Sequence, residues 1–274
     1  MPIEQVVVMA VIQGLAGFLP LSASGHLALA PLFLGWSAAG LPPLEAALHG
    51  GALAALLLYF WRDVWEIAKD LPSLFKGRTR PGAKLAILLL AATLPVLVLA
   101  FTLRYFEIAA PSAPLTIAWA MAGFAPVLFL FDKFGVTIWR MQHMTTSQSL
   151  FIGFAQCLAF IPGIGGMAAT LTAARFLGYE RAEAARFALL LFIPLLLGRL
   201  ALDLYGLLGA GADAFPVAAQ HLLIAFGATA LTGLLAVSFL LSWLRRASLL
   251  PFVLYRLAVG LALLLFFHGL TPWS

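Results

Sequence analysis

The chain has 274 residues, of which 63% are hydrophobic and only 10% are charged, with 16 Lys and Arg against 11 Asp and Glu. Soluble domains do not have this composition, whereas a membrane helix needs about 20 apolar residues to cross the hydrocarbon core. Several windows qualify, so we predict an all-α polytopic membrane protein. The single cysteine, Cys157, excludes an internal disulfide and a cysteine-based metal cluster. The net charge of +5 fits cytoplasmic loops beside anionic lipid, so no nucleic-acid partner is expected.

The first apolar region, residues 3–35, is interrupted at FLPLSASGH, residues 18–26. Proline removes a backbone donor and glycine loosens a helix, and each half of the region is too short to span the membrane comfortably. We therefore predict a re-entrant helical hairpin. Its tip would lie at membrane depth, where irregular backbone is tolerated only if it lines a cavity or is buried in protein.

A second broken region, residues 148–177, is interrupted at FIPGIGGM, residues 160–167, and also predicts a re-entrant hairpin. Three uninterrupted spans are expected after each hairpin, at about 44–60, 85–103, 114–131, 187–207, 219–243 and 251–269. The segment 61–75 places Trp61 and Trp65 on one helical face, which is typical of a helix lying along the membrane interface.

The basic residues of the loops indicate the orientation of the chain. Six Lys and Arg lie in the loop 61–84, whereas the loop 104–113 has one and the loop 208–218 has none. Because cytoplasmic loops are enriched in Lys and Arg, we predict that both termini lie on the outer side of the membrane.

An offset of 142 residues superimposes the two broken regions, since FLP at 18–20 falls on FIP at 160–162. The two halves have opposite predicted orientations. We therefore predict one membrane domain, residues 1–274, built as an inverted repeat, with repeat one at 1–131 and repeat two at 148–269. In such folds the broken helices meet near the midplane and build the binding site. Helix N-termini at that point would bind phosphate or carboxylate.

Four stretches resemble the undecaprenyl-pyrophosphate phosphatase family of the BacA/UppP type, and together they cover nearly the whole chain. They are QGLAGFLPLSASGHLAL (13–29), LEAALHGGALAALLLYFWRD (44–63), GFAQCLAFIPGIGGMAAT (153–170) and RAEAARFALLLFIPLLLG (181–198). The resemblance implies an inverted-repeat fold, a polyprenyl-pyrophosphate substrate and recycling of the lipid carrier for cell-wall polysaccharides. It also implies the bacterial cytoplasmic (inner) membrane.

The chain departs from the motifs of this family at their charged positions. Gln13 and Gly17 stand at its carboxylate pair, Ala23 replaces a serine, and Gly165-Gly166-Met167 stand at the Ser-Arg-Ser of the second tip. Losing one preorganised electrostatic donor typically costs about 10²–10³ in rate. We therefore expect a divergent member that lacks the family's main catalytic residues. No cofactor is expected, except a divalent cation if the protein is an active phosphatase, since such a cation prefers carboxylate oxygens.

The predicted substrate-binding residues are polar side chains and glycines at the two tips: Gln13, Ser22, Ser24, Gly25, His26, Gln156, Gly163, Gly165, Gly166 and Thr170. If the protein is active, the candidate catalytic residues are His26, Glu45 and His49. Glu45 and His49 lie four residues apart on one helical face, where a carboxylate can orient an imidazole. No metal ligands are predicted.

For three arginines in the apolar regions we predict structural roles and no part in the binding site. Arg175 and Arg256 are expected to extend to the cytoplasmic surface, because long basic side chains bury their stems and keep their charges in water. Arg199 and Asp203 lie four residues apart, which favours a local ion pair.

Three functions stay open at this point. The preferred one is a membrane protein that binds a polyprenyl-phosphate-type lipid carrier, with or without translocating it, and without efficient hydrolysis, so that enzyme activity stays open but is not favoured. The alternative is a divergent but active undecaprenyl-pyrophosphate phosphatase. The third is a carrier of another small anion or a non-catalytic partner of membrane enzymes. The expected partners are a polyprenyl phosphate or pyrophosphate lipid and membrane lipids, with a homodimer as a further option.

Overall fold

The computed structural model describes residues 1–36, 41–109, 113–209 and 218–270, and these residues are almost entirely helical. The long helices are α3 (Leu41–Tyr59), α5 (Pro81–Tyr105), α6 (Pro114–Phe134), α9 (Arg181–Gly209), α10 (Ala219–Leu244) and α11 (Leu250–Leu270). Five of them are long and apolar enough to cross a membrane, and α3 with its bent continuation raises the number to six within the described ranges. The predicted class, a polytopic membrane protein, is therefore confirmed.

In both apolar regions that were predicted to be interrupted, the helix breaks at the segment that contains proline and glycine. α1 (Ile3–Phe18) and α2 (Ala23–Leu34) flank the first break. α7 (Thr146–Gln156), the 3₁₀ turn η3 (Cys157–Phe160) and α8 (Gly166–Phe176) surround the second. Each of these helices is shorter than the roughly 20 residues that a span requires.

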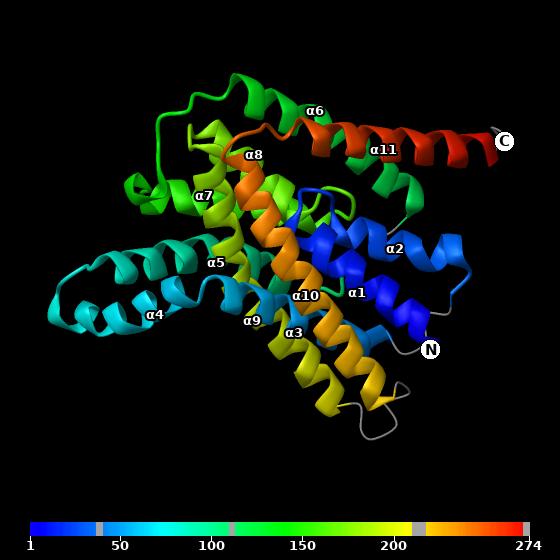
Figure 1. Cartoon of the computed structure of the whole chain (residues 1–274), viewed down its shortest axis with the longest axis horizontal. Coiled ribbons are helices and arrows are strands. Elements are labelled where there is room, and N and C mark those ends of the chain that lie inside the picture. Colours follow the sequence, from blue (N-terminus) through cyan, green and yellow to red (C-terminus); the bar gives the residue numbers. More distant parts are fainter. Residues whose placement is uncertain (37–40, 110–112, 210–217, 271–274) are drawn as a thin grey trace.

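The chain bends sharply after α3 into α4 (Trp61–Asp70), at an angle of 78° over the paired segments. α4 buries no side chain, and it continues into the 3₁₀ helix η1 (Leu71–Lys76). In Figure 1 α4 lies alongside the beginning of α5 and extends away from the other helices. The exposed Trp61 and Trp65 suit a helix that lies along the membrane interface.

The helices pack in pairs that are far apart in the sequence. α6 and α11 lie side by side, α10 packs on α1 and α3, and α5 packs on α7 (Figure 1). Glycines allow close approach at two of these contacts. A Cβ atom on Gly14 would lie 2.9 Å from the amide nitrogen of Gly233, and one on Gly153 would lie 2.8 Å from the Cα atom of Ala92. Small residues commonly permit such packing between membrane helices.

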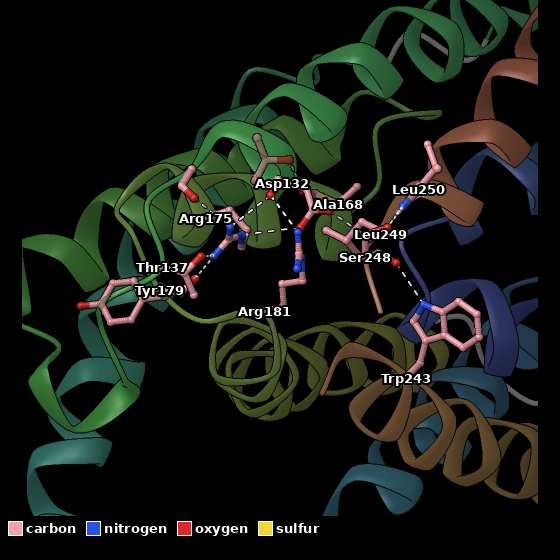
Figure 2. A network of polar contacts seen from close by, with 12 residues as sticks. Asp132, Thr137, Ala168, Arg175, Tyr179, Arg181, Trp243, Ser248, Leu249 and Leu250 are labelled. Atoms are coloured by element: carbon pink, nitrogen blue, oxygen red, sulfur yellow. Dashed lines mark hydrogen bonds and ion pairs between the residues drawn. The ribbon is translucent and has the colours of Figure 1, made fainter. Parts of the chain in front are cut away.

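A buried polar junction ties four helix ends together (Figure 2). The carboxylate of Asp132, at the end of α6, accepts from Arg181 Nε at 2.6 Å, at the start of α9, and from the amide of Leu249 at 3.0 Å, just before α11. Arg175 joins the junction from the last turn of α8, with its Nε 3.6 Å from the same carboxylate.

The prediction that Arg175 reaches the membrane surface is wrong, because its side chain is only 1% exposed. Its guanidinium donates to the Thr137 hydroxyl and to backbone carbonyls of Asp132, Gly135 and Tyr179. The last carbonyls of a helix have no partner within the helix, so this junction supplies the acceptors that a buried cation needs. Burial also raises the pKa of Tyr179 to about 12, so its phenol stays protonated and donates to Gln148 at 2.7 Å.

Candidate functional site

The two helix breaks meet at Ser22 and Gly163. The Ser22 hydroxyl oxygen accepts from the amide of Gly163 at 3.1 Å and from that of Gly25 at 3.4 Å, where it caps α2. Ser22 is 2% exposed and has φ 73°. Gly165 has φ 80°, and a Cβ atom there would lie 2.8 Å from the Cα atom of Ser22. The contact therefore requires glycine on the second tip.

Arg256 lies behind both tips and holds them together. Its guanidinium donates to the carbonyls of Gly163 at 2.7 Å, Ile164 at 2.8 Å and Pro20 at 3.3 Å. The prediction that Arg256 extends to the surface is wrong, since its side chain is fully buried. The tips are not helical, so their free carbonyls satisfy the guanidinium. A positive charge is thereby placed at the tips.

The His26 ring is held at both of its nitrogens. Nδ1 lies 2.8 Å from the carbonyl oxygen of Ser22, and Nε2 lies 2.7 Å from the Tyr255 hydroxyl. A carbonyl only accepts, so Nδ1 carries the hydrogen, and in the neutral ring Nε2 is then an acceptor. The imidazole therefore presents a lone pair toward Tyr255. We name Ser22, His26, Gly163, Tyr255 and Arg256 the tip centre.

The N-terminus of α8 adjoins the tip centre and has no side-chain cap. Gln156 reaches this helix end, since a Cβ atom on Gly166 would lie 3.1 Å from its carboxamide carbon. The Gln156 side chain is 4% exposed, and its Oε1 has no hydrogen-bond partner. Backbone N–H groups at the first turn of a helix bind anions without charged side chains. An uncapped helix start is therefore suited to a phosphate group.

The other predicted binding residues lie on the same two breaks. Ser24 is exposed at the start of α2, with its hydroxyl 3.5 Å from that of Ser22. Gln13 is 9% exposed in α1 and its amide lies near Gly17. Thr170 is fully buried and donates to the carbonyl of Gly166 at 2.7 Å, so it braces the first turn of α8.

The other two candidate catalytic residues, Glu45 and His49, pair with α9 and not with each other. His49 Nδ1 lies 2.7 Å from Asp203, and Arg199 binds both Glu45 at 3.0 Å and Asp203 at 2.9 Å. The local ion pair of Arg199 and Asp203 is confirmed, but the carboxylate that contacts His49 is Asp203. Across the described ranges no hydrogen bond links His49 or Glu45 to His26.

The sequence interpretation missed Tyr255 and Arg256 as site residues. They are adjacent in an otherwise apolar span. An ionisable residue inside a membrane helix marks a functional site by default, so the signal was present. It was assigned to the surface because Arg256 lies within two turns of the start of the span.

The donor set at the tip centre does not fit a divalent metal. It offers one imidazole and the hydroxyls of Ser22 and Tyr255, but no carboxylate, which is the ligand that Mg²⁺ and Ca²⁺ prefer. Within the ranges that the structure describes, no group of three or more His, Cys, Asp or Glu side chains could hold a metal ion.

The fold and the tip centre define a multi-pass membrane protein with broken helices that meet around a histidine, a serine and a buried arginine. A family model described as bacitracin resistance protein BacA matches residues 6–262, and the chain belongs to this family. It is 43% identical over 267 residues to undecaprenyl-diphosphatase 1 of Rhodospirillum rubrum, covering 95% of this chain and 93% of that protein. It is 38% identical over 274 residues to the undecaprenyl-diphosphatase of Geotalea daltonii, covering 98% and 99%. The undecaprenyl-diphosphatase of Maricaulis maris is 37% identical to this chain over 268 residues, which cover 97% of this chain and 100% of that protein.

The preferred sequence interpretation, a lipid-carrier binder or translocator without efficient hydrolysis, is wrong in the light of these relatives. Their names are those of phosphatases and point to the active-phosphatase alternative. The interpretation rested on the side chains missing from the two motifs. It placed Arg256 at the surface, whereas this cation lies at the tips.

Proposed function

We propose that this protein is an undecaprenyl-diphosphatase that removes the terminal phosphate from a polyprenyl diphosphate lipid. The proposal is supported by relatives of that name that match nearly the full chain. The observation that carries it is the tip centre, where Ser22 contacts both His26, whose Nε2 is an acceptor, and Gly165, the residue before the uncapped N-terminus of α8. A base and an anion site within one centre are what phosphoryl transfer to water requires.

The terminal phosphate binds at the first turn of α8, next to Gln156. The backbone N–H groups and the helix dipole attract the phosphate oxygens there. Arg256 adds a positive charge behind the tips, which favours the negative charge of the diphosphate. These groups are preorganised, so they stabilise the charge that spreads over the equatorial oxygens in the transition state.

His26 acts as the general base. Its Nε2 takes a proton from water while the water oxygen attacks the terminal phosphorus. The bond from this phosphorus to the bridging oxygen breaks, and that oxygen leaves on the polyprenyl phosphate. The second product is inorganic phosphate. The hydrogen bond from Nδ1 to the Ser22 carbonyl keeps the ring in the required tautomer.

We further propose that the protein is a divergent member of its family. Gln13, Gly17 and Gly166 stand where the motifs have charged residues. Arg256 compensates for the missing arginine of the second tip but not for the missing carboxylates. Turnover is therefore slower than in a relative that carries the complete motifs. That the protein forms a homodimer stays a prediction.

We also propose that α1–α2 and α7–α8 are re-entrant hairpins of an inverted repeat, with both termini outside the bacterial cytoplasmic membrane. Two observations support this. α1 packs on α10 as α7 packs on α5. The glycine contacts between these pairs, Gly14 with Gly233 and Gly153 with Ala92, recur at offsets close to the 142 residues that relate the tips.

The test is phosphate release from undecaprenyl diphosphate by purified protein in detergent. We expect measurable turnover, reduced about 10²–10⁴-fold by His26→Ala, because a positioned general base contributes about that factor. His143→Ala is the matched control, since His143 is exposed in the loop between α6 and α7. Release no faster than from empty micelles, or equal rates for the two variants, would refute the proposed function.

A further inference from the structure

Tyr255 is the side chain that contacts the reactive nitrogen of His26. The two residues lie 229 positions apart, yet the phenol oxygen is 2.7 Å from Nε2. The rings are nearly parallel, at 22°, with their centroids 5.7 Å apart. The contact is therefore both a hydrogen bond and a stacking contact, and it fixes the plane of the imidazole.

The direction of this hydrogen bond follows from the other nitrogen. Nδ1 donates to the Ser22 carbonyl, so Nε2 accepts and the Tyr255 hydroxyl donates. The phenol oxygen consequently occupies the position from which a water molecule would deliver its proton to Nε2.

Tyr255 differs from Arg256 in its surroundings. Arg256 is fully buried and anchors the backbone of both tips, whereas Tyr255 is 40% exposed. A partly exposed phenol contributes less to packing, and its hydroxyl can move away from Nε2 without opening the core. α11 thus supplies two adjacent residues with different roles: Arg256 is fixed in place, whereas the Tyr255 hydroxyl is a hydrogen-bond donor that can move.

We propose that Tyr255 holds His26 in place before substrate binds and then contacts the substrate, which makes it a further catalytic residue in the reaction of the proposed function, on which this inference rests. Before substrate binds, the phenol donates to Nε2 and holds the ring in place. When the diphosphate and a water molecule enter, the phenol donates to a phosphate oxygen, and Nε2 accepts from the water. The phenol keeps its proton throughout, so the water supplies the only proton that His26 gains.

The experiment compares Tyr255→Phe with Tyr205→Phe, a matched control on α9 whose side chain is 71% exposed. Phosphate release from undecaprenyl diphosphate gives kcat and KM. Modification of His26 by diethyl pyrocarbonate, followed by mass spectrometry of its peptide, gives the reactivity of Nε2 without any need for turnover. Phenylalanine keeps the ring, so stacking and folding are preserved.

For Tyr255→Phe we expect kcat to fall about 10-fold, the factor that one hydrogen bond is worth, with KM within about twofold of the original. The His26 modification rate should rise several-fold, because Nε2 loses its donor, and Tyr205→Phe should change neither quantity. An unchanged kcat and an unchanged modification rate would overturn the inference. If the unmodified protein releases no phosphate, the proposed function fails and the positioning role fails with it. A faster modification of His26 in Tyr255→Phe would then confirm the contact alone, so the two failures are distinguishable.

Discussion

At the scale of single residues, the tip centre depends on positions where a side chain would not fit. Gly165 has φ 80°, in the left-handed region that favours glycine, and it faces the backbone of Ser22. Ser22 itself has φ 73° although it is not glycine. Such conformations cost about 1–3 kcal/mol and persist only where surrounding contacts impose them. Here the contacts are the two hydrogen bonds to the Ser22 hydroxyl.

Gly165→Ala is expected to destabilise the protein by about 1–3 kcal/mol, from backbone strain, and to lower phosphate release. Its methyl group would displace Ser22, whose carbonyl orients His26. Thermal unfolding in detergent and the release assay are the measurements. Gly123→Ala, in α6 with nothing within 4 Å of the added methyl group, is the control. If both variants melt and react alike, the packing of the two tips does not constrain the site.

At the scale of elements, the buried polar junction around Asp132 holds the second tip in place through α8. α8 carries the tip at its first residue, Gly166, and ends in the junction at Arg175 (Figure 2). Asp132 is 4% exposed and receives Arg181 and the amide of Leu249. Removing one partner of a buried ion pair leaves the other charge uncompensated, which typically costs about 3–5 kcal/mol.

Asp132→Asn is therefore expected to lower stability by about 3–5 kcal/mol, and to reduce turnover because α8 loses its anchor. The comparison is Glu180→Gln, which breaks the exposed ion pair with Arg140. Exposed pairs contribute about 0–1 kcal/mol. The measurement is the denaturation midpoint of each variant. Similar midpoints for Asp132→Asn and Glu180→Gln would mean that the junction does not stabilise the helix ends.

At the scale of the whole molecule, the proposed orientation places the loop between α5 and α6 outside and the loop after α4 inside. The charge of the loops supports this, since the second is rich in Lys and Arg. The orientation determines which side of the membrane the tip centre can serve.

Single cysteines in a Cys157→Ala background test the orientation. Ile108→Cys, at an exposed position after α5, should react with a membrane-impermeant maleimide added to intact cells. Arg78→Cys, after η1, should react only when the membrane is permeabilised, because the reagent cannot cross it. The reverse pattern would place the termini inside and contradict the proposed orientation of the chain.

The sequence alone determined the class of the protein, the positions of the helix breaks and much of the candidate site. Hydrophobic runs and proline or glycine breaks act through neighbouring residues, so they can be interpreted locally. Ser22, His26 and Gly163 were predicted because they lie in the broken stretches themselves. The start of α9 was placed six residues late, because its first turns are polar and the prediction followed hydrophobicity.

Only the tertiary structure decided where the charged residues of the spans go. The sequence gives the cost of burying Arg175 and Arg256, but not the carbonyls of distant segments that satisfy them. The contact of Tyr255 with His26 likewise joins positions 229 residues apart. Such contacts depend on how helices pack across the whole chain. Because the free energy of a buried charge depends on its partners, local pattern alone predicted a surface location for two residues that the fold buries.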